Sequence, residues 1–401
     1  MPGGKAYLML VLVLAAGLLA GCTQEKQVEK PAAEAEQPAE QPEEIKIGVL
    51  LPLSGNLAPF GEGMLKGARV AEKELNDAGG VLGAKVTLVV EDTATDPAKA
   101  VEAAQKLINV DGVRAIVGAA ASSSTLAVAP ICEENRVVLV SPASTSPLVT
   151  DAGDYIFRVV ASDTLQGKVL AELALAKNYT KAATFVINND YGIGLQDVFT
   201  RSFEDAGGRV VLQIQYDPGR GDYRTELQQL RGSEAEVVMF VSYPEDASVI
   251  LRQAVELGVE QQWIAAEGIA SEEMFSYAGM KEAMEGMLLT KPASATDSPE
   301  YQHFYRLFKE MYPGEEPGIY ADTTYDATMM IAKAIEAAGA YDGEKIKEAL
   351  YEISKGYRGA TGDKTFDENG DIMYQDYVVL KATNGTFVEV GTWKQGRLIM
   401  E

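Results

Sequence analysis

The sequence predicts an α/β protein made of two doubly wound parallel-sheet lobes, joined by a hinge that the chain crosses more than once. From Ile45 onward, short β-branched runs alternate with longer segments of helical periodicity, which is typical of parallel strands covered by helices on both faces. The alternation occurs twice, with matching elements in the same order. An aromatic-Gly-x-Gly core also occurs twice, in "PFGEG" at 59–63 and "YGIG" at 191–194, and each copy opens a helical segment followed by "AGG". The repetition indicates two lobes of similar construction.

The first set of elements begins at Ile45. Its strands are expected at 45–52, 85–92, 113–119 and 137–142, and its helices at 63–80, 96–109 and 122–135. The second set begins at Lys181. Its strands are expected at 181–188, 209–216, 236–244 and 263–268, and its helices at 194–208, 222–232 and 245–258.

The C-terminal part does not form a third copy of this pattern. A strand is expected at 286–292, helices at 298–311 and 320–339, and hairpin turns at Asn369-Gly370 and Asn384-Gly385. This part is too short to be an independent domain, so its pieces are expected to complete the two lobes. The predicted division is 45–160 plus 291–361 for lobe 1, and 161–290 plus 362–401 for lobe 2.

The N-terminus is expected to lie outside the fold. Residues 1–21 have the features of a signal peptide, because Lys5 precedes an apolar run that is too short to span a membrane. The run ends in "LAGC", which resembles a lipoprotein lipobox, so Cys22 is expected to be acylated; the alternative is an ordinary signal peptide with a chance cysteine. Residues 22–44 are rich in Pro, Ala, Glu and Gln and are expected to form an extended tether. The expected location is the outer face of the cytoplasmic membrane, with the lipid as the only membrane contact.

Composition excludes several classes of function. The formal net charge of −24 argues against nucleic acid as a partner. His303 is the single histidine, which weakens any interpretation that needs a histidine base or a histidine-rich metal site. Cys132, the one cysteine besides Cys22, is expected to be a small buried apolar residue. No metal or cofactor is predicted.

Two motifs that suggest cofactors or metals do not fit on inspection. "FGEGMLKG" matches a loose dinucleotide fingerprint, but Pro52 ends the strand and about eight residues intervene, whereas the fingerprint must follow its strand directly. "DENGD" at 367–371 suggests a calcium loop, but the required glycine and glutamate positions hold Ile372 and Val378. Neither motif is expected to bind the ligand it suggests.

Polar residues follow several predicted strands, where ligands bind in doubly wound sheets. In "GAAASSST", Ser122 begins a helix; the serines are either helix caps or, with the free N–H groups of the helix start, an anion site. A nucleophilic serine is disfavoured because the chain has no G-x-S-x-G elbow and no fitting histidine base. "SPASTSP" at 141–147 is either a polar loop or a second binding loop. Glu267 follows the strand "WIAA" and is either a solvated charge or a cleft carboxylate.

The chain from Ile45 onward resembles the leucine/isoleucine/valine-binding protein family, the amino-acid receptors of ABC importers. The words that carry the resemblance occur in order along the chain: "SGNLAPFGEG", "NDAGGVLG", "GAAASSST", "SPASTSP", "FRVVASDTLQG", "DYGIGL", "YPEDAS", "AAEGIAS", "EGMLLTKP" and "YADTTYDA". The resemblance implies the type I periplasmic-binding-protein fold. A first-lobe cysteine pair found in some members is absent, since Thr93 and Ala121 occupy those positions.

The resemblance also implies roles for individual residues. Ser122 and Thr145, with backbone groups around Ser123 and Ser144, are implied to hold the carboxylate of an amino acid and part of its ammonium. Glu267 is implied to pair with the ammonium. The implied walls of the side-chain pocket are the aromatic residues Phe60, Tyr191, Tyr243 and Tyr320, with Tyr325 as the alternative to Tyr320. At the position of Phe60 the family often has tyrosine.

The implied function is capture of a free amino acid, branched-chain or otherwise apolar, by closure of two lobes, followed by delivery to an ABC permease. The protein is expected to be a monomer and not an enzyme. A receptor for an amide, urea or aromatic acid, and a sensory receptor without a transporter, are the alternatives within the binding class. A surface hydrolase is the alternative from another class.

Overall fold

The computed structural model describes residues 43–401, which form one compact unit. The predicted signal peptide, Cys22 and all but the last two residues of the predicted tether lie outside the described residues. The fold begins at Glu44, one residue before the predicted start. Among the helices within 43–401, none combines the length and apolarity that a membrane crossing needs.

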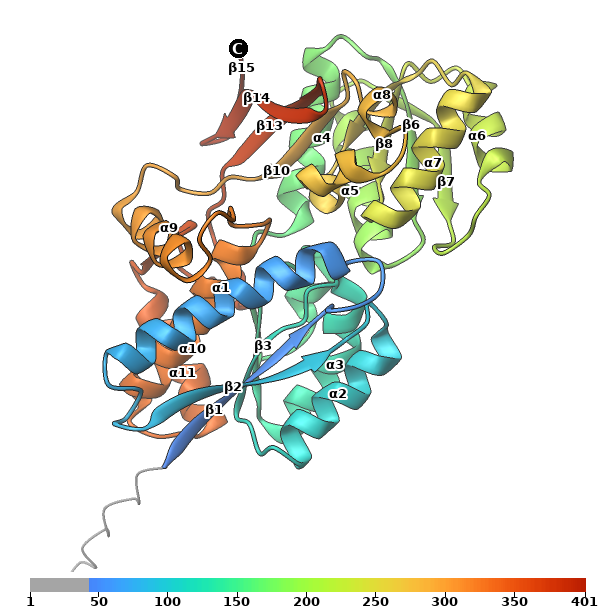
Figure 1. Ribbon diagram of the computed structural model, residues 1–401. Coiled ribbons are helices and arrows are strands. Elements are labelled where there is room, and N and C mark those ends of the chain that lie inside the picture. The colour runs from blue at the N-terminus through green and yellow to red at the C-terminus, as the bar shows by residue number, and fades with distance from the viewer. Residues whose placement is uncertain (1–42) are drawn as a thin grey trace, which may run out of the picture. The chain divides into compact units, whose positions relative to one another are not determined.

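The first sheet is parallel throughout, with strand order β2-β1-β3-β4-β5 (Figure 1). Its strands are rich in Val, Ile and Leu, and all except the half-buried edge strand β2 are largely buried: β1 (Glu44–Leu51), β2 (Lys85–Asp92), β3 (Ala115–Gly118), β4 (Val138–Ser141) and β5 (Ile156–Arg158). Helices α1 (Ala58–Asp77), α2 (Pro97–Asn109) and α3 (Ser122–Asn135) connect the first four. The strand order reverses between β1 and β3, so loops at their carboxyl ends diverge and leave a crevice.

The second sheet repeats this order with β7-β6-β8-β9-β10 and is then extended by antiparallel strands β13, β14 and β15. Its parallel strands are β6 (Lys181–Ile187), β7 (Arg209–Tyr216), β8 (Val237–Val241), β9 (Gln262–Ala265) and β10 (Leu288–Pro292). Its helices are α4 (Asp163–Ala176), α5 (Asp190–Asp205), α6 (Arg224–Arg231), α7 (Pro244–Leu257) and α8 (Met280–Ala283). The predicted doubly wound architecture of two lobes is confirmed; β5 and α4 were not predicted.

The C-terminal segment returns to the first sheet before it completes the second. Helix α9 (Pro299–Met311) contacts α1, and α10 (Ala321–Ala338) packs along α1 and against β3 and β4, where Figure 1 shows it beside the first sheet. Helix α11 (Gly343–Ser354), which was not predicted, contacts α10 and β4. The chain then forms the short hairpin β11 (Arg358–Gly359) and β12 (Gly362–Asp363) before β13 (Tyr377–Thr383), β14 (Thr386–Lys394) and β15 (Arg397–Met400). Three segments therefore connect the sheets; the residue boundaries of the lobes stay a prediction.

The two predicted turns differ in outcome. Asn384 and Gly385 have φ values of 52° and 77° and join β13 to β14 by a two-residue loop, as expected for a hairpin turn with left-handed residues. At Asn369-Gly370 the chain turns as predicted, but no hairpin forms, because a single bridge between Phe366 and Ile372 takes the place of two paired strands. Instead of continuing a hairpin, Asp371 pairs with Arg158 of β5.

The repeated aromatic-Gly-x-Gly motif lies inside helices α1 and α5, which begin earlier than the predicted residues 63 and 194. Helix α1 begins at Ala58, with Pro59 preset for its first turn, and α5 begins at Asp190, where Asn189 accepts a cap hydrogen bond from Gly192 N–H at 2.9 Å. A Cβ on Gly61 would lie 2.0 Å from the Pro52 carbonyl oxygen, and one on Gly192 would lie 2.1 Å from that of Ile187. The first glycine of each copy thus lets the helix start against the end of its own strand.

Candidate functional site

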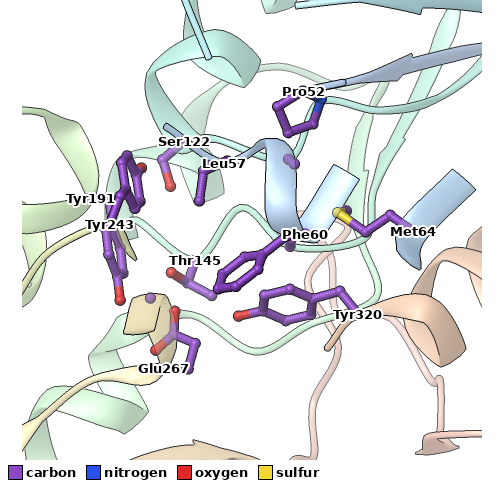
Figure 2. A pocket seen from close by; sticks show the side chains of 13 residues that line it. Pro52, Leu57, Phe60, Met64, Ser122, Thr145, Tyr191, Tyr243, Glu267 and Tyr320 are labelled. Atoms are coloured by element: carbon purple, nitrogen blue, oxygen red, sulfur yellow. The ribbon is translucent and has the colours of Figure 1, made fainter. Parts of the chain in front are cut away.

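A cavity lies where loops from the carboxyl ends of both sheets meet (Figure 2). The empty space within it, including the part open to solvent, is about 370 Å³. Seven of the predicted site residues line it: Phe60, Ser122, Thr145, Tyr191, Tyr243, Glu267 and Tyr320. The lining also includes residues that were not predicted: Pro52, Leu57, Met64, Ala120, Ala143 and Gly268. These are apolar or small, and nothing in the sequence distinguishes them from core residues.

Helix α3 begins at the cavity with its N–H groups free for an anion. Its N-cap is Ala121, which makes no side-chain cap, so the interpretation of the serines as capping residues is wrong. The first helical bond runs from Thr125 N–H to Ala121, which leaves the N–H groups of the three serines outside the helical ladder. Together with the helix dipole, such groups attract a carboxylate. Ser122 lines the cavity beside them.

The loop after β4 presents one side chain to the cavity and uses its neighbours as supports. Thr145 lines the cavity, and its Oγ1 has no hydrogen-bond partner among residues 43–401. Ser144 Oγ donates to the Ala119 carbonyl oxygen at 3.0 Å, and Ser146 N–H donates to Ser122 Oγ at 3.2 Å. The Ser144 side chain therefore binds the end of β3 and does not line the cavity. The prediction for Ser144 concerned its backbone groups and stays a prediction.

Ser123 also points away from the cavity, toward the second sheet's helices. Its Oγ accepts a hydrogen bond from Asp190 N–H, at 3.2 Å, at the start of α5. A Cβ on Gly194 of the same helix would lie 2.8 Å from Cδ of Pro147, so the glycine permits close approach of the two lobes. These contacts join the two lobes beside the cavity.

Aromatic rings form the walls. Tyr191 and Tyr243 are stacked, with centroids 5.9 Å apart and an interplanar angle of 1°, whereas Phe60 meets Tyr320 edge-on at 6.5 Å. Tyr320 has a φ of 64°, a strained conformation for an aromatic residue, and precedes α10 as its N-cap. Tyr325 is buried elsewhere, where its hydroxyl donates to Glu74 Oε2 at 2.6 Å. Of the two tyrosines, Tyr320 is the one at the cavity.

Glu267 supplies the one carboxylate among the thirteen residues lining the cavity. It lies one residue beyond Ala266, which follows the end of β9, and it is 3% exposed. Its Oε2 has no hydrogen-bond partner within the described part of the chain. The hydroxyls of Tyr191 and Tyr320 are likewise buried without a partner in residues 43–401. Figure 2 shows the Glu267 carboxylate, the Thr145 side chain and the Tyr320 hydroxyl facing the same space. Buried polar atoms are costly unless paired, so this grouping indicates a polar ligand.

A second buried acid lies behind this surface and was not predicted. Asp163 is fully buried in the first turn of α4, and neither carboxylate oxygen has a partner among the described residues. Burial, and then the negative charge of Glu267, raise the pKa of Asp163 well above its ordinary value. Burial also raises the pKa of Glu267, although its own backbone N–H and Gln166 offset part of the effect. We call Asp163 and Glu267 the acidic pair.

The tyrosine hydroxyls around the acidic pair remain protonated. Burial, followed by the charge of Glu267, raises the pKa of both Tyr191 and Tyr320. Both hydroxyls can therefore donate hydrogen bonds to the carboxylate or to a ligand. The cavity as a whole offers donors from the first lobe, an acid from the second and aromatic surface between them.

The chain was compared with known protein families and structures. The model of a family described as periplasmic binding protein matches residues 44–386. The leucine-, isoleucine-, valine-, threonine-, and alanine-binding protein of Pseudomonas aeruginosa is 34% identical over 339 residues, 84% of this chain and 89% of that protein. A Leu/Ile/Val-binding protein homolog of Brucella suis is 30% identical, covering 85% of this chain and 91% of its own.

Solved structures give the same result. The structure of a leucine binding protein from Thermotoga maritima matches with a TM-score of 0.81 and 33% identity, covering 88% of this chain and 99% of the other. A branched-chain amino acid transporter substrate binding protein from Streptococcus pneumoniae, solved in complex with isoleucine, matches with a TM-score of 0.77 and 27% identity over 86% of this chain and 99% of its own. The chain is thus a member of the periplasmic binding protein family, with the type I fold and in the group of leucine/isoleucine/valine-binding proteins.

Proposed function

We propose that this protein captures a free amino acid with a branched-chain or other apolar side chain and delivers it to an ABC permease. The observation that carries the proposal is the buried carboxylate of Glu267, whose Oε2 has no partner among residues 43–401, in a cavity walled mostly by aromatic and apolar groups. An ammonium group would pair with this carboxylate, and an apolar side chain would fit the walls. Relatives that are named as binding leucine, isoleucine and valine support the same ligand class.

Each end of the zwitterion has a matching group. The carboxylate is proposed to accept hydrogen bonds from Ser122, Thr145 and the N–H groups at the start of α3, including that of Ser123. Backbone groups beside Ser144 are proposed to complete this contact. The ammonium is proposed to bind Glu267 of the second lobe.

The rings are proposed to enclose the ligand's side chain. Phe60 and Tyr320 form one wall, and the stacked pair Tyr191 and Tyr243 forms the other. Because the donors come from the first lobe and the acid from the second, only the closed state provides every contact. The ligand favours closure by this difference in affinity between the open and closed states, and the permease would recognise the closed form.

The family supports a location outside the cytoplasm, and the N-terminal sequence supports a more specific proposal. Periplasmic binding proteins act outside the cytoplasm, and we propose that residues 1–21 direct export and that Cys22 carries the lipid anchor. The mature protein would be held at the outer face of the membrane by its tether, as a monomer that performs no catalysis. A sensory role without a transporter would use the same binding chemistry.

Ligand analogues test the proposal on a soluble form that begins at Glu43. Thermal unfolding is measured with each free amino acid, and then with urea, simple amides and benzoate, because a ligand of the folded state raises its stability. Leucine, isoleucine or valine is expected to raise the midpoint most. 4-Methylpentanoate, which lacks the ammonium, and isoamylamine, which lacks the carboxylate, are expected to bind far more weakly than leucine. A shift with benzoate or an amide and none with any amino acid would contradict the proposal.

A further inference from the structure

Arg158, the last residue of β5, is fully buried close to the proposed ligand site but outside its cavity. Its Nη1 donates to the carbonyl oxygens of Ser144 at 3.3 Å and Ser146 at 2.9 Å. These two residues flank Thr145, which lines the cavity. The guanidinium thus holds the loop from behind on both sides of the residue proposed to contact the ligand.

The third carbonyl of this loop is held in the same direction. The Thr145 carbonyl oxygen accepts a hydrogen bond from Asp163 N–H at 2.7 Å. Three consecutive carbonyl groups, of residues 144–146, therefore bind donors on the side away from the cavity. Because the carbonyl and N–H of one peptide point in opposite directions, the hold on the Ser144 carbonyl turns the Thr145 N–H toward the side of the cavity that the Thr145 side chain lines. The next N–H, of Ser146, donates to Ser122 Oγ, and Pro147 has none.

Asp371 fixes the guanidinium from the opposite side. Its two carboxylate oxygens accept from Nε and Nη2 of Arg158, each at 2.5 Å, and Thr150 Oγ1 bridges Nη2 at 2.7 Å and Asp371 at 2.8 Å. Asp371 is placed by a tight turn, in which its N–H donates to Asp367 at 3.0 Å. This turn belongs to the last segment that passes from the helices of the first sheet to the second sheet.

Stability alone does not account for such a pair. A buried ion pair pays a large desolvation cost, and apolar replacements of similar volume are often as stable or more so. The bidentate geometry of arginine, in contrast, fixes position and orientation. Such a pair can therefore serve to hold a binding loop in one orientation even when it adds nothing to the free energy of unfolding.

Resting on the proposed function, we infer that Arg158, oriented by Asp371, is a positioning residue that sets the geometry of the carboxylate-binding loop and ties it to the hinge. Lysine at this position offers one ammonium, which cannot serve Asp371 and both loop carbonyls in the same geometry. The loop should then lose its fixed orientation while the acid-lined and aromatic parts of the cavity stay in place.

Calorimetry with Arg158→Lys on the soluble protein tests this inference, with leucine and leucinamide as paired ligands. Leucinamide keeps the ammonium and side chain but replaces the carboxylate with a neutral amide. The variant is expected to weaken leucine binding about tenfold or more and leucinamide binding less than about threefold. Equal losses for both ligands, or no loss for leucine, would overturn the inference.

Asp326→Asn is the matched control. Asp326 is a fully buried carboxylate that accepts from Ala360 N–H at 2.7 Å and from Thr361 N–H at 2.9 Å, in the same crossover region but away from the loop. It is expected to lower the unfolding midpoint and leave the ratio of the two affinities unchanged. A merely structural role for Arg158 would produce the same result as this control.

Hydrogen exchange decides the question independently of the ligand's identity. In the empty protein, Arg158→Lys and the milder Asp371→Asn are expected to increase deuterium uptake in peptides that cover residues 142–150, whereas Asp326→Asn is not. Asp371→Asn serves if Arg158→Lys does not fold. Unchanged uptake in these peptides would refute the positioning role. If the wild type binds no amino acid while uptake rises as expected, the proposed function fails and the positioning role stands.

Discussion

Replacing Glu267 by glutamine separates two effects of the buried acid: its contribution to ligand affinity and its effect on the stability of the empty protein. In the proposed complex the ligand's ammonium is buried against this carboxylate, which is 3% exposed. Truncating one partner of a buried charge pair costs about 2–5 kcal/mol, mostly from the charge left unpaired. Glutamine retains a carbonyl acceptor at the same distance, so the lower part of this range applies. We expect a loss of about 2–3 kcal/mol, which corresponds to about 30- to 150-fold in Kd.

The empty protein should respond in the opposite direction. Burial raises the pKa of Glu267, so the folded state binds this proton more tightly than the unfolded chain does. Stability contributed by the group is therefore lost as the pH rises from the unfolded value, about 4.3, through the raised folded value. At neutral pH glutamine removes this penalty, and the empty variant is expected to unfold at a higher temperature than the wild type.

Calorimetric titration at neutral pH gives the Kd, and thermal unfolding without ligand gives the stability. Glu260→Gln is the control, because it makes the same chemical change at an exposed position of the second lobe. Equal amino acid affinity in Glu267→Gln and the wild type would show that Glu267 does not bind the ammonium. A lower unfolding temperature of the empty variant would show that the contacts of the carboxylate with its own backbone N–H and with Gln166 outweigh the cost of burying it.

The remaining predictions concern pH, helix crossing and closure. Amino acid affinity is expected to fall as the pH is lowered from about 8 to about 5, because the acidic pair has raised pKa values and less of it is then in the ionised form that binds an ammonium. Calorimetry across this range measures the affinity, and an affinity that does not change with pH would exclude a role for the ionisation of the acidic pair. Gly67→Ala should destabilise the protein by about 1–3 kcal/mol, because its Cβ would lie 1.9 Å from the Ala321 carbonyl oxygen, whereas Gly63→Ala meets only an ordinary contact at 3.4 Å and should be tolerated. Chemical denaturation compares the two, and equal stability would refute the close crossing of α1 and α10. Gly194→Ala places a methyl group 2.8 Å from Pro147 of the other lobe and should weaken ligand binding about fivefold or more by opposing closure; an unchanged Kd with unchanged unfolding would show that this contact does not limit closure.

The sequence was informative wherever structure depends on local pattern. Buried parallel strands between helices are visible as β-branched runs, and both lobes could be predicted from them. The side chains at the cavity follow from the same logic, because Ser122, Thr145 and Glu267 each stand just beyond a strand's carboxyl end. Their roles in ligand binding rest on resemblance and await the experiments above.

The features that could not be predicted depend either on contacts between residues far apart along the chain or on the exact residue at which a helix begins. Asp163 follows a serine at a helix start, where an acid is an ordinary partner of the dipole, and its burial against Glu267 arises only in the folded molecule. Arg158 and Asp371 are 213 positions apart, and neither lies in a motif that indicates an ion pair. The interpretation of the serines as caps failed by one residue, since Ala121 and not Ser122 precedes α3.

The return of the chain to its first sheet has a consequence for folding. Helices α10 and α11 pack on the first sheet, but the parallel strands of the second sheet, within residues 181–292, are made before them. During synthesis, the face of β3 and β4 that α10 and α11 cover therefore stays exposed until most of the chain has emerged. Such long-range closure slows folding and keeps nascent chains open. For a chain that crosses a membrane before it folds, this delay would be an advantage, because the polypeptide stays unfolded, and so competent for translocation, until its last helices have been synthesised.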